Sequence, residues 1–332
     1  MKSTLALILI ILSTSCNSGT SSKNESTASV SKNSEATKPE VATFDTALYL
    51  KKINHISNGD TSGKWPVKVH LPMEGALFPY HRIVAFYGNL YSKKMGILGE
   101  IPKDEMLKKL QFEANEWQKA DTSLKVIPAL HYIAVTAQAG GDKKRMRMPF
   151  HQIDTILNWA KEINALTFLD IQVGWSTLEE EVPQLEKYLM QPNIHLGIDP
   201  EFSMKFGDLP GKRIGTFDAK DINYAINYLA SLVKKYNLPP KVLVVHRFTQ
   251  GMVTNYQNIK IVPEVQVVMD MDGWGNKTLK RSTWLRYIYK EPVEFTGFKI
   301  FYKNDLKKDS QGLYTPEELL KFVPQPVYIQ YQ

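Results

Sequence analysis

Cysteine is nearly absent from this chain, which has one cysteine, Cys16, among its 332 residues. A single cysteine cannot form an internal disulfide, so a disulfide-stapled scaffold is excluded. Long apolar runs are also scarce. Residues 5–12 form an unbroken apolar run, and neither it nor any later run reaches the roughly 20 residues that a transmembrane helix requires. The sequence therefore predicts no membrane-spanning helix.

Several catalytic signatures are missing as well. The chain has no Gly-x-Ser-x-Gly elbow, no glycine-rich nucleotide loop and no His-x-His motif after its first strand. No run of His, Asp and Glu has a recognised metal-ligand spacing. We therefore expect no cofactor and no metal. The formal net charge of +7 comes from dispersed basic residues without a nucleic-acid-binding motif, so nucleic acid is not an expected partner.

The N-terminus has the layout of an export signal, in which Lys2 precedes the apolar run and Ser13-Thr14-Ser15 leads into Cys16. Small residues directly before a cysteine resemble the lipobox of bacterial lipoproteins. The resemblance implies a signal peptide over residues 1–15 and lipidation of Cys16, which would anchor the chain to the bacterial cell envelope, on its periplasmic or surface face. The alternative is an ordinary cleaved signal with an incidental cysteine.

Residues 16–43 are rich in Ser, Thr, Asn, Lys and Glu and poor in apolar residues. Such a composition buries too little apolar surface to fold, so we expect a disordered tether there. The folded domain is expected over residues 44–332, with residues 44–80 as an N-terminal extension. That length suits one large barrel.

Short apolar, β-branched runs alternate with amphipathic helical segments along the folded part. Near-continuous apolar strands are typical of a parallel sheet covered on both faces. Eight of them in an α/β chain favour a single (β/α)8 TIM-type barrel, with an open doubly wound sheet as the alternative. We expect the strands at residues 83–87, 125–130, 166–170, 194–199, 241–246, 265–270, 295–301 and 327–331, and the clearest helices at residues 104–120, 150–164 and 218–236.

Polar residues gather where the expected strands end, which is where barrel enzymes hold their chemistry. A carboxylate beside an apolar core is costly, so acidic residues that converge on one rim require a reason. Crowded carboxylates raise one another's pKa, so that one stays protonated while another stays ionised. Glycoside cleavage needs this division between a proton donor and an ionised carboxylate. The acidic candidates are Asp170, Asp199, Glu201, Asp270 and Asp272.

Other residues at the same rim are candidates for substrate binding, the aromatic ones because rings stack on sugars, although core packing explains them equally well. These candidates are Tyr87, His131, Gln172, Trp175, His246, Arg247, Trp274 and Gln330. The acidic residues also have structural interpretations. Asp199 could end a strand in a turn, Asp170 could pair with Arg247, and Asp270 with Asp272 could cap a loop or hold a cation.

The segment Gly197-Ile198-Asp199-Pro200-Glu201 resembles the end of the chitinase-like glycoside hydrolase signature, in which an Asp-x-Glu on the fourth barrel strand supplies the acid. The resemblance implies that Glu201 donates a proton and that Asp199 supports it. The family's Ser-x-Gly-Gly on strand three is absent, so its substrate-assisted mechanism is not implied. The domain also resembles bacterial lipoproteins that share the phrases VAFYGN, GILGE, GIDPEF and KVLVVH, a resemblance that brings no activity with it.

Basic residues follow several strands and would surround the acidic mouth. They suit an anionic polymer such as a cell-wall or uronic-acid glycan, although ordinary solvated loops have the same composition. These residues are Lys143, Lys144, Arg145, Arg147, Lys205, Lys212, Arg213, Lys277, Lys280, Arg281, Lys303, Lys307 and Lys308.

The sequence thus predicts an envelope-anchored glycoside hydrolase that acts on a polysaccharide. Glu201 would be the acid, Asp170 or Asp270 would be the nucleophile or base, and Asp199 and Asp272 would tune them.

Two alternatives stay open. One is a non-catalytic barrel that binds a glycan or another envelope partner through aromatic rim residues and basic loops. The other is a cation-dependent hydrolase that uses Asp270, Asp272 and His246.

Overall fold

The computed structural model describes residues 45–68, 70–307 and 309–332. The expected signal peptide, the lipidation site Cys16, the tether over residues 16–43 and the rim residue Lys308 lie outside the described residues. Among the helices that are described, none is long and apolar enough to cross a membrane.

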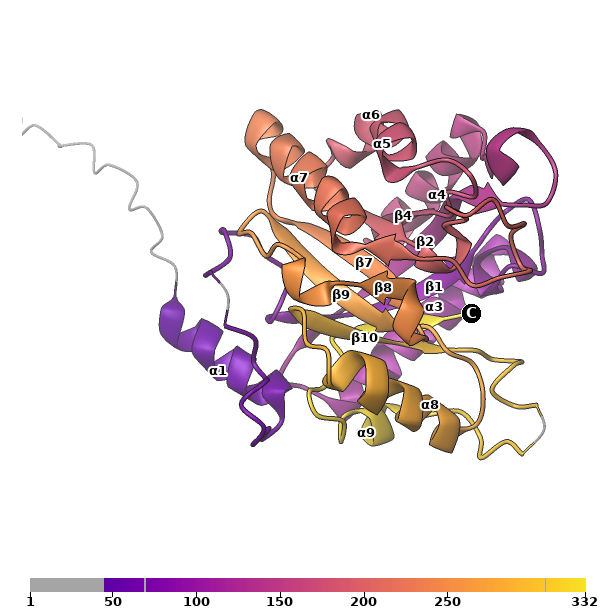
Figure 1. Cartoon of the computed structure of the whole chain (residues 1–332). Helices are drawn as coiled ribbons and strands as arrows, with labels where there is room; N and C mark the ends of the chain where they lie inside the picture. Colours follow the sequence, from indigo (N-terminus) through magenta and orange to yellow (C-terminus); the bar gives the residue numbers. More distant parts are fainter. Residues whose placement is uncertain (1–44, 69, 308) are drawn as a thin grey trace, which may run out of the picture. The chain divides into compact units, whose positions relative to one another are not determined.

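Eight parallel strands form a closed barrel, which confirms the predicted (β/α)8 fold (Figure 1). The barrel closes because the first strand pairs with the second on one side and with the last on the other: Ile83 lies opposite Ile127 and Tyr328. The eight strands are β1 (His81–Gly88), β2 (Lys125–Ala137), β4 (Leu166–Ile171), β5 (Ile194–Ile198), β7 (Lys241–Arg247), β9 (Val265–Met271), β10 (Phe295–Ile300) and β11 (Tyr328–Tyr331).

Three short strands lie outside the barrel. β3 (Arg145–Arg147) returns antiparallel along the end of β2, which explains why β2 runs beyond the predicted residues 125–130 to Ala137. A bulge between Ile133 and Val135 shifts the register of β2 against β4. The other two, β6 (Phe217–Asp218) and β8 (Val253–Thr254), pair with each other.

Helices separate the strands and cover the outside of the barrel, as Figure 1 shows. The long ones are α3 (Lys103–Ala120), α4 (Phe150–Glu162) and α7 (Ala219–Tyr236), each with an apolar face buried against the sheet. Asp218 caps α7 in a reciprocal capping box with Asp221, which fixes where that helix begins. The remaining α-helices are α1 (Thr46–Ser57), α2 (Ile97–Glu100), α5 (Leu178–Glu181), α6 (Glu186–Leu189), α8 (Lys277–Thr283) and α9 (Pro316–Leu319).

Short 3-10 turns complete the connections: η1 (Asp142–Lys144), η2 (Val182–Leu185), η3 (Pro200–Phe202), η4 (Gln250–Met252) and η5 (Tyr256–Asn258). A π-helical segment, η6 (Trp284–Tyr289), continues α8.

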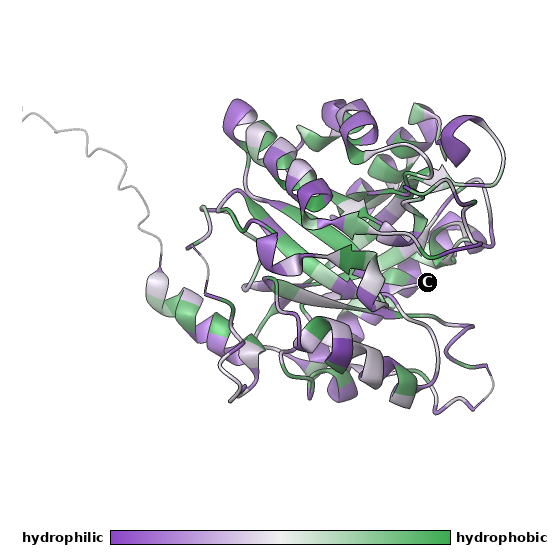
Figure 2. Cartoon of the chain, viewed as in Figure 1, coloured by the Kyte–Doolittle hydropathy of each residue, from purple (hydrophilic) through white to green (hydrophobic). Residues whose placement is uncertain are grey.

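The core has two layers because successive residues of a strand point to opposite faces. On β1, Val84 and Phe86 pack outward against the helices, whereas Ile83 and Ala85 belong to the cluster inside the barrel. Figure 2 shows the strands as largely hydrophobic. From the extension, α1 adds apolar side chains to the interior cluster, and Phe78 packs against Phe295 with 5.1 Å between ring centroids.

Candidate functional site

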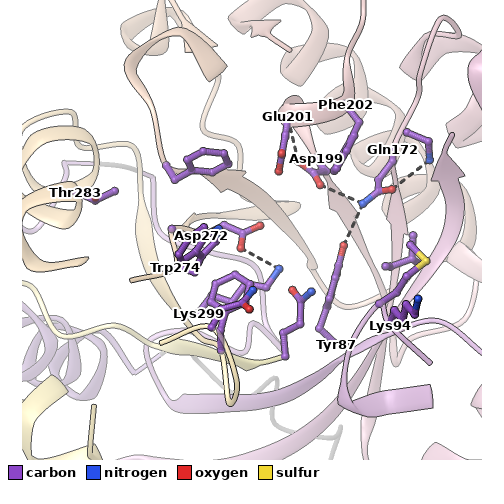
Figure 3. Close-up of a pocket in the computed structure, with 18 of the residues that line it drawn as sticks. Tyr87, Lys94, Gln172, Asp199, Glu201, Phe202, Asp272, Trp274, Thr283 and Lys299 are labelled. Atoms are coloured by element: carbon purple, nitrogen blue, oxygen red, sulfur yellow. Dashed lines mark hydrogen bonds and ion pairs between the residues drawn. The ribbon is translucent and has the colours of Figure 1, made fainter. Parts of the chain in front are cut away.

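A pocket of about 620 Å³ opens at the carboxyl ends of the barrel strands (Figure 3). Its polar lining comes from several strands of the barrel: Tyr87 from β1, Gln172 from the end of β4, Asp199 and Glu201 from the end of β5, Asp272 from the end of β9, and Lys299 from β10. Aromatic side chains complete the walls, namely Phe202, Phe248, Trp274 and Phe301. The pocket therefore lies where barrel enzymes hold their catalytic groups.

Strand alternation decides which predicted residues reach this end of the barrel interior. His246 shares the interior face of β7 with Val244, whereas Arg247 is one residue further and points outward. Arg247 pairs with Glu291 Oε2 over 2.5 Å and donates to the carbonyl oxygens of Gln250 and Tyr287. Arg247 is thus held among outer loops, away from the pocket.

Asp170 lies at the centre of the interior polar cluster and is fully buried. Tyr87 donates its hydroxyl to Asp170 Oδ2 over 2.9 Å. Asp170 Oδ1 lies 3.3 Å from His131 Nε2 and 3.4 Å from His246 Nε2. Burial alone would raise the pKa of Asp170, but the two histidines outweigh it and lower the pKa below its ordinary value. The considered pairing of Asp170 with Arg247 is replaced by these contacts.

His246 links Asp170 to the two acidic residues at the end of β9. His246 Nδ1 lies 3.1 Å from Asp272 Oδ2 and 3.4 Å from Asp270 Oδ2. Burial would lower the pKa of His246, but Asp170 and the other two carboxylates reverse this and raise it well above its ordinary value. The carboxylates around His246 thus outweigh the effect of its burial.

Asp272 lines the pocket and has a cationic partner there. Lys299 Nζ lies 2.9 Å from Asp272 Oδ1 and 3.9 Å from the centre of the Tyr87 ring. Burial would raise the pKa of Asp272, but Lys299 and then His246 lower it below its ordinary value. Asp272 is thus held as a carboxylate at the wall of the pocket.

Glu201 has the opposite electrostatic environment. Burial, followed by repulsion from Asp272, raises its pKa from 4.5 to about 7, although Lys299 and His246 act in the other direction. Glu201 lies in η3, which begins after Asp199 because the Asp199 side chain accepts the Glu201 backbone N–H over 3.0 Å. The pocket therefore combines one carboxyl group that favours protonation with one that favours ionisation.

The Asp199 side chain that holds this turn has further contacts of its own. Gln172 donates to Asp199 Oδ2 over 3.3 Å and to the Tyr87 hydroxyl over 3.5 Å. Burial, together with repulsion from nearby carboxylates that include Glu201, raises the pKa of Asp199 well above its ordinary value. Asp199 thus ends the strand in a turn, as its structural interpretation expects, and it also lines the pocket.

Two of the acidic candidates lie deeper than the pocket. Asp170 and Asp270 are fully buried and are not among the residues that line it. Asp270 faces His246, and burial raises the pKa of Asp270. Neither is placed to touch a molecule in the pocket, so the carboxylate that faces Glu201 across the cavity is Asp272.

The substrate-binding candidates divide into three groups. Tyr87, Gln172 and Trp274 line the pocket. His131, His246 and Gln330 lie in the barrel interior, where His131 Nδ1 is 2.5 Å from the Tyr328 hydroxyl and 3.1 Å from Gln330 Nε2.

Trp175 and Arg247 lie neither in the pocket lining nor in the barrel interior. The Trp175 indole donates to the carbonyl oxygen of Asp208 over 2.7 Å, and Lys144 Nζ lies 4.8 Å from the centre of the Trp175 ring. Trp175 is not among the residues that line the pocket.

Lys299 and the aromatic wall residues Phe202, Phe248 and Phe301 were missed in the sequence. Lys299 interrupts an otherwise apolar strand and shares its face with Gly297. A lysine at an interior position of a buried strand is a signal that could have identified it.

Most of the rim lysines and arginines have acidic partners. Arg145 and Arg147 both pair with the buried Glu181, over 2.8 and 2.7 Å, and Lys277 pairs with Glu318 over 2.6 Å. Further pairs are Lys143–Glu180, Lys205–Asp221, Arg213–Asp208, Lys280–Asp305 and Lys303–Glu100. The rim is therefore less cationic than the sequence suggests, because acidic side chains, most of them from other segments of the chain, pair with these residues.

The sequence matches no protein-family model and no curated protein. Among solved structures, the chain is similar to a Burkholderia cenocepacia dihydropteroate synthase complexed with 7,8-dihydropteroate, at 9% identity and a TM-score of 0.36 over 76% of this chain and 86% of that one. It is also similar to a ruminal GH26 endo-β-1,4-mannanase, at 11% identity and a TM-score of 0.33 over 75% of this chain and 58% of that one. Likeness at this level concerns the fold alone.

Proposed function

We propose that this pocket hydrolyses a glycosidic bond of a polysaccharide, with Glu201 as the general acid and Asp272 as its ionised partner. The observation that carries the proposal is the contrast between two carboxyl groups in one pocket. Burial and Asp272 raise the pKa of Glu201 to about 7, whereas Lys299 and His246 lower that of Asp272. Environments that separate two pKa values in this way assign the acid and the base of a reaction.

The chemistry needs no group beyond these side chains and water. Glu201 gives its proton to the glycosidic oxygen, and the bond from that oxygen to the anomeric carbon breaks with its electron pair on the oxygen. Asp272 stabilises the positive charge at the anomeric carbon, either by attacking it or by taking a proton from the water that attacks. The sum is the addition of one water molecule across the bond.

The walls suit a carbohydrate. Trp274 is 55% exposed and lines the pocket, which leaves a ring face for stacking on a sugar. Asp199 and Gln172 supply hydrogen-bonding groups for hydroxyls. Because most rim cations are already paired, we propose a neutral polysaccharide in place of the anionic one that the loop composition suggests.

The test is release of reducing ends from a panel of polysaccharides. We expect turnover by the wild-type protein and its loss, by about 10²–10⁴-fold, in Glu201→Gln and Asp272→Asn. Glu180→Gln is the matched control, because Glu180 is a rim carboxylate that pairs with Lys143 outside the pocket. Unchanged turnover in Glu201→Gln would remove the proposal. Glycan binding without product from any polysaccharide would favour the non-catalytic barrel.

We also propose that the chain is exported and anchored through a lipid on Cys16. The support is the small-residue segment before that cysteine and the apolar run that precedes it. Metabolic labelling with a fatty acid in a bacterial host tests this, with Cys16→Ser as the control. Absence of label on the wild-type chain would indicate an ordinary cleaved signal.

A further inference from the structure

Three buried side chains converge beneath the floor of the pocket. His131 comes from β2, Asp170 from β4 and His246 from β7, and all three are fully buried. One ligand atom from each, His131 Nε2, Asp170 Oδ1 and His246 Nε2, lies within 4.8 Å of the other two. Tyr87 separates this group from the pocket, since its hydroxyl caps the second oxygen of Asp170.

The three atoms are close but not hydrogen-bonded. Asp170 Oδ1 lies 3.3 Å from His131 Nε2 and 3.4 Å from His246 Nε2, yet none of the three has a hydrogen-bond partner among the described residues. Buried polar atoms are rarely left this way. Two imidazole nitrogens and one carboxylate oxygen that gather within 4.8 Å of one another without hydrogen bonds between them can be bound together by one metal ion.

The distances between the ligand atoms also match those expected around a metal ion. Two zinc bonds of about 2.1 Å that meet at a tetrahedral angle separate their ligand atoms by about 3.4 Å. Both separations from Asp170 Oδ1 agree with this value. The third pair, His131 Nε2 and His246 Nε2, lies within 4.8 Å.

Each of these side chains is held by a contact at its other polar atom. His246 Nδ1 lies 3.1 Å from Asp272 Oδ2, and His131 Nδ1 lies 2.5 Å from the Tyr328 hydroxyl. Metal-ligating histidines are oriented by such contacts on the ring nitrogen that does not bind the metal.

A glycine on β5 leaves room for the cluster. A Cβ atom at Gly197 would lie 2.3 Å from Asp170 Oδ1 and 2.4 Å from His131 Nε2. Any other residue at position 197 would displace two of the three ligand atoms. The absence of a side chain at Gly197 thus leaves the space that these ligand atoms occupy.

We propose that this cluster binds one divalent transition-metal ion, for which Zn²⁺ is the best match, through His131 Nε2, Asp170 Oδ1 and His246 Nε2. Two imidazoles and one carboxylate form a donor set that suits zinc and its neighbours better than Ca²⁺ or Mg²⁺. The ligand set differs from the Asp270, Asp272 and His246 group considered from the sequence. The inference does not depend on the proposed glycosidase activity.

The experiment measures metal binding without any substrate. The purified protein is stripped with a chelator, checked for retained fold by circular dichroism, and titrated with Zn²⁺ alone by calorimetry and with Co²⁺ alone by visible absorption. We expect one ion per chain and visible d–d bands from the bound cobalt. An anomalous-scattering map of zinc-soaked crystals should place the ion between the three named atoms.

Variants locate the ion and separate this inference from the catalytic one. Asp170→Asn should weaken Zn²⁺ binding by at least tenfold, while Glu201→Gln, a carboxylate change in the pocket above, should leave it unchanged. A folded wild-type protein that binds neither Zn²⁺ nor Co²⁺ would overturn the inference and leave a metal-free histidine–aspartate ion pair. An anomalous peak at Asp270 and Asp272 would overturn the ligand assignment.

Discussion

Glu201 and Asp272 face the same cavity from strands β5 and β9, which flank β7 in the barrel (Figure 3). Repulsion from Asp272 adds to burial in raising the pKa of Glu201 to about 7, while Lys299 and His246 keep Asp272 ionised. The two groups thus differ in protonation near neutral pH although both are carboxylic acids. This difference gives the following predictions.

Activated substrates should separate the roles of the two residues. A leaving group that departs as a stable phenolate needs no proton, so Glu201→Gln should keep most of its activity on an aryl glycoside while losing it on the polysaccharide. Asp272→Asn should lose both activities, because the charge at the anomeric carbon is not stabilised. Equal losses in both variants on both substrates would contradict the assignment of Glu201 as the acid.

Activity should fall as the pH rises through about 7. Glu201 donates only when protonated, and its pKa is raised from 4.5 to about 7 by burial and Asp272 against the opposing charges of Lys299 and His246. The measurement is kcat/KM against pH, which reports the free enzyme.

The substitution Lys299→Met tests whether Glu201 causes this fall in activity on the alkaline limb of the pH profile. Removing a cation that lowers the pKa of Glu201 should move the alkaline limb to higher pH, whereas Lys299→Arg should leave it nearly in place. A limb that stays fixed in Lys299→Met would mean that another group titrates.

Glu201→Gln should stabilise the protein at alkaline pH. The pKa of Glu201 is higher in the folded state than its ordinary 4.5, so wild-type stability falls as the pH rises from about 4.5 to about 7. Glutamine stays neutral, and the variant should gain about 1–2 kcal/mol in free energy of unfolding at pH 8, allowing for solvent screening, and almost nothing at pH 4. Urea denaturation at the two pH values measures this, and a gain of equal size at both would show a packing effect.

Trp274→Ala should weaken substrate binding more than catalysis. An exposed ring that stacks on a sugar contributes about 1 kcal/mol, so KM should rise several-fold with kcat nearly unchanged. Trp175→Ala is the matched control, since that indole is exposed but lies outside the pocket lining. Similar kinetics for the two variants would remove Trp274 from the binding surface.

The fold was predictable because most barrel strands are near-continuous apolar runs, with amphipathic helical segments between them. The end of β2 was not, since its last residues depend on pairing with β3, a contact with a later segment that local sequence does not encode. The alternation of side chains along a strand explains part of the arrangement at the rim. It places His246 inside the barrel and Arg247 outside, a distinction available from the sequence alone.

Two features could not be predicted from the sequence: the depth of an acidic residue along the barrel axis and the ion pairs across the rim. Asp170 lies near the end of β4 and Asp272 directly follows β9, yet Asp170 is sealed beneath Tyr87 while Asp272 reaches the pocket. The rim cations are neutralised by acids far along the chain, as in the pair of Lys277 with Glu318. Such contacts depend on the three-dimensional path of several loops.

The measurement that tests the central claim most directly is a crystal structure of Glu201→Gln with a bound oligosaccharide. The account predicts a glycosidic oxygen within about 2.6–3.2 Å of the side chain at position 201, and the adjoining anomeric carbon facing the Asp272 carboxylate. An oligosaccharide that lies along the rim with its glycosidic bonds away from both side chains would contradict it.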